Sequence, residues 1–179
     1  MKNLDLILLL LIALSCNNKK EKINFSETQE QIELETDIKK NQLIVSDSTS
    51  IANVALSFIN GYTENCNQMN DRIEIVEWVN SNHNASQKFK SELKRITEEA
   101  DKADPELGLG FNPIFNAQDY PDKGFKLVDF DTISGIVNVK DKILDNGFRM
   151  KIKLIKEKDK WLVNGMGIIN MPEIEWIEK

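Results

Sequence analysis

The spacing of the apolar residues changes once within residues 48–179 of this 179-residue chain, and that change restricts the fold more than any other feature of the sequence. Between residues 48 and 104 the apolar residues recur at intervals of three and four, which is the period of an amphipathic α-helix. After residue 124 they alternate with polar residues, as in a β-strand with one buried face. Helices in one part of a chain and strands in the next predict an α+β fold.

The first expected helix begins near residue 50. Ser48, Thr49 or Ser50 can cap it, because a short hydroxyl side chain accepts a hydrogen bond from an unpaired backbone N–H group in the first turn. Its apolar residues follow the helical period and predict one buried face. These residues are Ile51, Val54, Ala55, Phe58, Ile59 and Tyr62.

Two more N-terminal helices are expected before residue 104. The second covers Asp71–Asn80. Its inward-facing residues are Ile73, Val76 and either Trp78 or Val79. The third runs from Ser86, which can cap it, to about Ala103, and Pro105 prevents its continuation. Its inward-facing residues also follow the helical period: Phe89, Leu93, Ile96 and Ala100.

A connection that contains several Gly and Pro residues separates the helices from the strands, with one short strand near Ile114–Ala117. Asp145–Gly147 reads Asp-Asn-Gly, which is a strong signal for a tight hairpin turn. Strands joined by short turns are antiparallel, so the helices are expected to pack on one face of a curved antiparallel sheet of about four strands. The expected strands are Phe125–Asp131, Ile133–Lys140, Phe148–Lys156 and Trp161–Ile169.

The first fifteen residues differ from the rest of the chain. Leu6–Leu14 is an unbroken apolar run of nine residues, whereas a membrane-spanning helix needs roughly 20. A short run of this kind after Lys2 fits the apolar core of a secretory signal. Three interpretations are open: the signal of a lipoprotein, the signal of a secreted protein, and a retained membrane anchor.

The sequence IALSC at Ile12–Cys16 resembles the lipobox of bacterial lipoproteins. That resemblance implies a signal peptide over residues 1–15, cleavage before Cys16 and attachment of a diacylglycerol to the Cys16 thiol. Two or three acyl chains would make the attachment stable, since one chain binds a membrane marginally. Asn17 stands where some inner-membrane lipoproteins have Asp, which favours the outer membrane, facing the periplasm.

The chain is expected to continue as a tether and one domain. Residues 16–47 are charged, contain neither Gly nor Pro, and hold scattered apolar residues. Such a segment buries too little surface to offset its ordering entropy. We expect a flexible tether, with a plain spacer favoured over a partner-binding segment. Residues 48–179 have a length typical of one domain.

The charge composition argues against one class of partner. The chain carries 23 basic and 29 acidic side chains and shows no dense basic cluster. A protein that binds nucleic acid neutralises phosphates with clustered Lys and Arg, so nucleic acid is not expected. The sequence contains no phosphate loop and no dinucleotide fingerprint, so no cofactor is expected.

Asp119 and Tyr120 are the candidate catalytic pair. An aspartate can accept a proton, and a tyrosine hydroxyl can donate a hydrogen bond to a developing oxyanion. The two residues stand next to Pro121 in a stretch of turn-favouring residues. A structural turn is therefore the competing interpretation.

Metal and thiol chemistry have weaker signals. His83 is the one histidine of the chain and lies among Asn and Ser residues, so we expect a solvated loop position and no multi-histidine metal site. The acidic residues between 98 and 106 lack the spacing of an EF-hand calcium loop.

Cys66 has no partner within the chain if Cys16 is lipidated, and a reactive thiolate needs electropositive surroundings. Its nearest charged neighbours in sequence are acidic, so Cys66 is expected to be buried and inert.

Four stretches of the chain resemble a family of small bacterial envelope proteins, often lipoproteins, with a nuclear-transport-factor-2-like domain. They are FINGYTENC, WVNSN, FKSELKRITEEADKADPELGLGFNPIFNAQDYPDKGF and KWLVNGMGIINMP. The resemblance implies a cone-shaped α+β domain and leaves a homodimer open. It implies no established activity.

Together, these features favour a non-enzymatic binding or interaction module, held at a bacterial envelope through lipidated Cys16. Its partner would be a small apolar ligand or an envelope protein. The alternative is a small-molecule isomerase or dehydratase that uses Asp119 and Tyr120 at the mouth of the cone. The two functions differ in whether those two side chains face a cavity.

Overall fold

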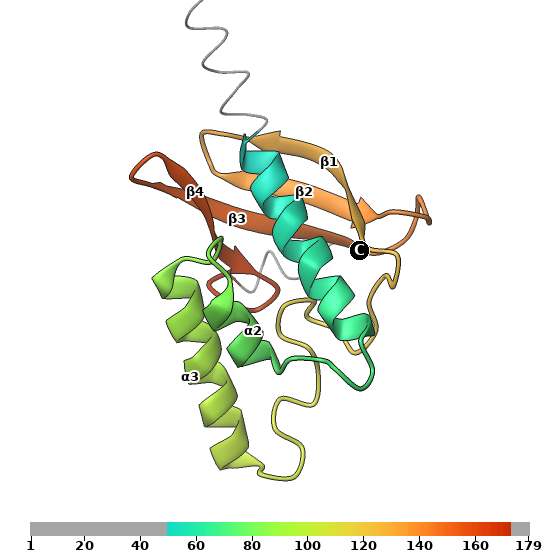
Figure 1. The fold of residues 1–179 in the computed structure, drawn as a ribbon, viewed down its shortest axis with the longest axis vertical. Helices are drawn as coiled ribbons and strands as arrows, with labels where there is room; N and C mark the ends of the chain where they lie inside the picture. The colour runs from blue at the N-terminus through green and yellow to red at the C-terminus, as the bar shows by residue number, and fades with distance from the viewer. Residues whose placement is uncertain (1–49, 173–179) are drawn as a thin grey trace, which may run out of the picture. The chain divides into compact units, whose positions relative to one another are not determined.

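The structure is a computed structural model that describes residues 50–172. The predicted signal segment, Cys16 and the tether lie outside the described residues. Three helices come first and four strands follow (Figure 1), which confirms the predicted α+β order. Within the described part, no helix is both long enough and apolar enough to cross a membrane.

The four strands form one antiparallel sheet in the order β1-β2-β3-β4. Each strand pairs with the one before it in the chain, as expected for strands joined by short turns. The first strand has the predicted bounds, and the last two begin within one residue of the predicted positions. The observed strands are β1 (Phe125–Asp131), β2 (Ile136–Asp141), β3 (Arg149–Glu157) and β4 (Lys160–Met166).

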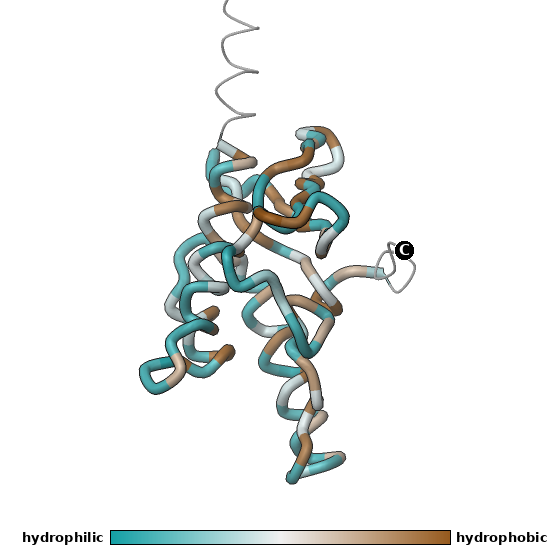
Figure 2. The backbone as a smooth tube through the Cα atoms, turned by 90° about the vertical axis from the view of Figure 1, so that its right-hand side faces the viewer, coloured by the Kyte–Doolittle hydropathy of each residue, from teal (hydrophilic) through white to brown (hydrophobic). Residues whose placement is uncertain are grey.

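Helix α1, described over residues 50–67, packs on the sheet (Figure 1). The residues predicted to form its apolar face are buried, apart from Val54, which is half-buried. Phe58 of α1 belongs to the same core as Val137 of β2 and Ile152 of β3. Apolar and polar positions interleave along the tube in Figure 2, because each helix or strand buries one face.

Helices α2 (Ile75–Ser81) and α3 (Gln87–Ala103) pack against each other, and α3 also contacts β4. Ser86 caps α3 as predicted, because its hydroxyl accepts a hydrogen bond of 3.1 Å from the backbone N–H of Phe89. The same hydroxyl donates to Oδ1 of Asn164 at 2.8 Å. The Ser86 N–H donates to the Val163 carbonyl at 2.9 Å. The start of α3 is therefore joined to β4.

The second helix begins at Ile75, later than the predicted Asp71. Asn65 of α1 holds the intervening chain by two hydrogen bonds: its Nδ2 donates to the Ile73 carbonyl at 2.8 Å, and its Oδ1 accepts from the Ile73 N–H at 3.0 Å. Ile73 is consequently outside the core and 43 % exposed. The prediction that Ile73 faces inward is wrong, whereas Val79 is buried as predicted.

The second strand also begins later than predicted, at Ile136 rather than Ile133. The Asp131 carboxylate accepts hydrogen bonds from the N–H groups of Ile133 and Ser134, which closes a turn between β1 and β2. Ile133 lies in this turn and is almost fully exposed. The first residues of the predicted strand therefore form a turn, because the Asp131 side chain binds their backbone N–H groups.

The connection between α3 and β1 contains a turn where a short strand was predicted over Ile114–Ala117. Oδ1 of Asn112 accepts hydrogen bonds from the N–H groups of Ile114 and Phe115, and Asn112 pairs with Ala117 through the backbone. This turn packs closely on the chain just after β4. The contact is so close that a Cβ at Gly167 would collide with the Pro113 carbonyl oxygen. The predicted strand at this position is wrong.

Candidate binding pocket

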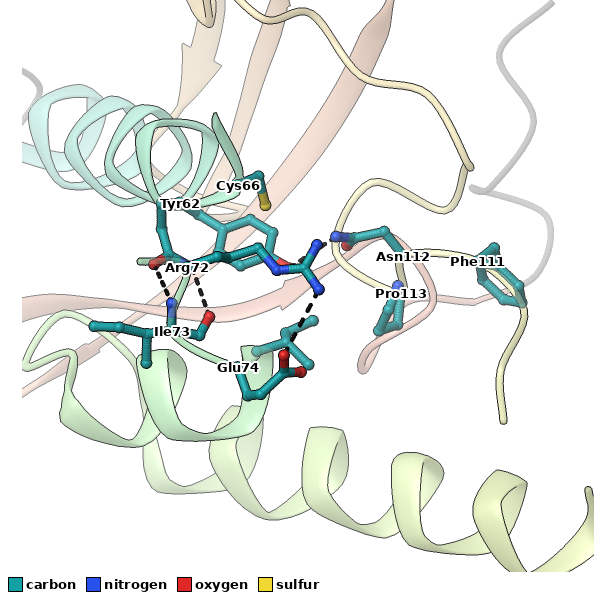
Figure 3. A pocket seen from close by; sticks show the side chains of 10 residues that line it. Tyr62, Cys66, Arg72, Ile73, Glu74, Phe111, Asn112 and Pro113 are labelled. Carbon is teal, nitrogen blue, oxygen red and sulfur yellow. Dashed lines mark hydrogen bonds and ion pairs between the residues drawn. The ribbon is translucent and has the colours of Figure 1, made fainter. Parts of the chain in front are cut away.

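A pocket of about 250 Å³ opens at the C-terminal end of α1 (Figure 3). Its lining comes from three segments: Tyr62, Asn65 and Cys66 of α1, residues 72–75 around the start of α2, and residues 111–113 of the connection. Drug-sized ligands occupy cavities of about 300–1,000 Å³. A pocket of this size therefore suits a smaller molecule.

Arg72 extends across this pocket, with its guanidinium directed toward Asn112 and Glu74 (Figure 3). Its backbone position follows from Asn65, which holds the next residue, Ile73, beside α1. Nη2 of Arg72 lies 3.6 Å from Oε1 of Glu74, and the two side chains are 53 % and 76 % exposed. Exposed ion pairs contribute little to stability, so Glu74 holds the guanidinium weakly.

Asn112 fixes the opposite wall of the pocket to α1. Its Nδ2 donates a hydrogen bond of 2.7 Å to the hydroxyl of Tyr62, while its Oδ1 is occupied by backbone N–H groups of its own turn. Tyr62 is buried and packs against the rings of Trp78 and Phe115. The wall is therefore held by both a polar contact and aromatic packing.

Cys66 lines the pocket at the end of α1. Burial raises the pKa of the Cys66 thiol, and a contact with the Tyr62 hydroxyl and the charge of Arg72 oppose part of this rise. The residue is half-buried and forms no disulfide with any described residue. A raised pKa agrees with the expected inert thiol, because the thiolate is the nucleophilic form. The expectation that Cys66 is buried is wrong, because the residue is half-buried.

Asp119 and Tyr120 do not line this pocket. Asp119 is exposed. Tyr120 is half-buried, and its ring stacks on Phe115 with centroids 4.8 Å apart. Its hydroxyl donates to Oδ1 of Asn67 at 3.3 Å. These contacts match the competing interpretation of a structural turn, and the catalytic role of the pair stays a prediction.

The other candidate groups from the sequence lie on the surface. His83 is exposed in the turn between α2 and α3, as expected. The acidic residues between 98 and 106 are exposed, and Glu98 and Glu99 form ion pairs with Lys94 and Arg95. Among residues 50–172, no three His, Cys, Asp or Glu side chains form a group that could hold a metal ion.

Sequence reasoning did not identify Arg72, Phe111 or Asn112 as pocket residues. Asn112 precedes Pro113, and an Asn-Pro pair favours a turn, so a structural role for Asn112 could have been inferred. Arg72 had no comparable signal, because its position depends on the contact between Asn65 and the backbone of Ile73.

No protein-family model, curated protein or solved structure matches this chain. The class that the structure itself defines is an α+β domain with three helices followed by a four-stranded antiparallel sheet. Membership of the nuclear-transport-factor-2-like family stays an expectation from the sequence.

Proposed function

We propose that this protein is a lipid-anchored binding module of the bacterial envelope and that the pocket at the end of α1 is its binding site. In this proposal lipidated Cys16 supplies the attachment and residues 16–47 keep the domain away from the lipid headgroups. The single observation that supports binding is the open pocket, in which the Arg72 guanidinium stands beside apolar surface.

The packing between α1 and the sheet supports a site at the end of the helix rather than in the interior. Aromatic side chains fill the core with edge-to-face and stacked contacts among Phe58, Phe89, Phe115 and Phe125. Within residues 50–172, no buried side-chain nitrogen or oxygen lacks a hydrogen-bond partner. A ligand would therefore find no unpaired side-chain nitrogen or oxygen among these core residues, whereas the pocket presents the Arg72 guanidinium.

We also propose that the domain is a nuclear-transport-factor-2-like cone. The order of three helices and a four-stranded meander, with α1 on the sheet, supports this assignment. A fold of this kind hosts many functions, so the binding function is argued from the pocket.

Thermal unfolding in the presence of a small-molecule extract of bacterial envelopes tests the binding function. A ligand that binds the folded state raises Tm by mass action, so the extract should raise the Tm of the full chain in detergent. Ile73 lines the pocket and is partly exposed, so Ile73→Trp should fill the site and abolish the rise.

Ile133→Trp is the matched control, because Ile133 is exposed and lies outside the pocket. It should keep the full rise in Tm. No rise in the wild-type chain, or an equal rise in the Ile73→Trp variant, would contradict the proposed site.

A further inference from the structure

We infer that the pocket binds a small organic carboxylate with a short apolar body and that Arg72 holds its carboxylate group. This inference rests on the proposed binding function and adds the chemical class of the ligand to it. Three properties of the pocket lead to it: the geometry of Arg72, the use of the neighbouring acceptor groups, and the size and apolar surface of the lining.

The guanidinium of Arg72 matches a carboxylate in shape and charge. Guanidinium groups bind carboxylates through two parallel N–H donors, and such bidentate pairs are among the stronger hydrogen bonds in proteins. The 3.6 Å contact between Arg72 and Glu74 is longer than a hydrogen bond. An incoming carboxylate could therefore displace Glu74, whose exposed side chain can turn into water.

Apart from the Glu74 carboxylate, the side-chain acceptor groups of Asn65, Asn112 and Tyr62 in the pocket lining are already used inside the protein. Oδ1 of Asn65 accepts from the Ile73 N–H, and Oδ1 of Asn112 accepts from two N–H groups of its turn. The Tyr62 hydroxyl accepts from Nδ2 of Asn112. Once the Glu74 side chain has turned into water, the pocket therefore presents the donors of Arg72 more than it presents acceptors, which favours an anion over a cation or a hydrogen-bond donor.

The remaining lining limits the size and polarity of the ligand. Phe111, Ile73 and Ile75 line the pocket and are partly open to water, so covering them with an apolar group is favourable. The volume of about 250 Å³ is below the roughly 300–1,000 Å³ of cavities that hold drug-sized ligands. One aromatic ring or a short alkyl chain fits such a space beside a carboxylate.

Benzoate and its neutral counterpart benzamide test this inference, with backbone amide signals of the full chain in detergent recorded by NMR. Benzoate should shift the signals of residues 72–75, 111 and 112 in a saturable manner, and benzamide should not. Arg72→Gln should weaken benzoate binding by about tenfold or more, because it removes charge-assisted hydrogen bonds.

Two further variants test the same inference without changing Arg72, in case Arg72→Gln alters the local structure. Glu74→Gln removes the competing carboxylate and should tighten benzoate binding several-fold. Arg149→Gln removes an exposed arginine of β3 that does not line the pocket, and should leave binding unchanged.

Equal binding of benzoate and benzamide, unchanged binding by the Arg72→Gln variant, or no binding of benzoate would overturn the carboxylate inference. None of these outcomes alters the response of the Ile73→Trp variant to the envelope extract. If the extract raises the Tm of the wild-type chain but not of the Ile73→Trp variant, and benzoate does not bind, the proposed binding site stands and a carboxylate ligand is rejected.

Discussion

The carboxamide of Asn112 donates a hydrogen bond of 2.7 Å to the hydroxyl of Tyr62, and this contact joins the α3–β1 connection to helix α1. Tyr62 is buried, so Tyr62→Phe would leave Nδ2 of Asn112 without this partner. We expect the substitution to lower the free energy of unfolding by about 1–3 kcal/mol. Urea denaturation measures that difference.

Tyr120→Phe is the matched control for Tyr62→Phe. The Tyr120 hydroxyl also binds an asparagine, but its contact with Asn67 is exposed and 3.3 Å long. Its loss should change the free energy of unfolding by no more than about 0.5 kcal/mol. Equal losses in the two variants would contradict the role assigned to the Asn112–Tyr62 contact.

The Cys66 thiol should react slowly at neutral pH. In a Cys16→Ala background Cys66 is the remaining cysteine, so iodoacetamide reports on this thiol alone. Because burial raises its pKa, the modification rate should rise at a higher pH than for an ordinary cysteine. A rate that is already at its plateau at neutral pH would contradict the raised pKa of this half-buried thiol.

Arg72→Gln should move that pH profile further upward. The positive charge of Arg72 stabilises the Cys66 thiolate and lowers its pKa, so removing the charge raises the pKa. At a fixed alkaline pH the variant should therefore react more slowly. Arg149→Gln serves as the control and should leave the profile in place, while a downward shift in the Arg72→Gln variant would exclude the inferred proximity.

Ser86 should contribute more to stability than another serine of the same helix. Its buried hydroxyl accepts from Phe89 and donates to Asn164, so we expect Ser86→Ala to cost about 1–3 kcal/mol of unfolding free energy. Ser91 is exposed and binds carbonyl groups of its own helix, and Ser91→Ala should change stability by about 0.5 kcal/mol or less. Calorimetry of both variants compares them, and a neutral Ser86→Ala would contradict the capping role.

Attachment through Cys16 has a test that is independent of the fold. Cells that express the chain and receive a labelled fatty acid should incorporate the label into the wild-type protein and into the Cys66→Ala variant. The Cys16→Ala variant should stay unlabelled, because the acyl chains are proposed to bind at that residue. Label in all three proteins would remove the lipoprotein proposal.

The parts of the fold that could be predicted from the sequence are those set by local periodicity. The buried face of α1 and the bounds of β1 follow from residue spacing alone. Ser86 was predicted as a cap because its role depends on the next three residues. Each of these features can be predicted without knowing which distant residues are in contact.

The wrong predictions of secondary structure share one physical cause, which is a side chain that binds backbone groups of its neighbourhood. Asn65 delays the start of α2, Asp131 delays β2, and Asn112 replaces a short strand with a turn. Hydrophobic periodicity carries no information about such contacts. The pocket could not be predicted for a related reason, since Arg72 and Asn112 approach each other through contacts between segments distant in the sequence.

We propose that the protein is anchored at the envelope and binds its ligand in the pocket at the end of α1. Photo-crosslinking in living cells tests this binding most directly, with a photoreactive aromatic amino acid incorporated at position 73 or, as the control, at position 133. Mass spectrometry of the membrane fraction should find a defined small-molecule adduct at position 73 and none at position 133. The same adducts at both positions, or no adduct at position 73, would contradict the claim.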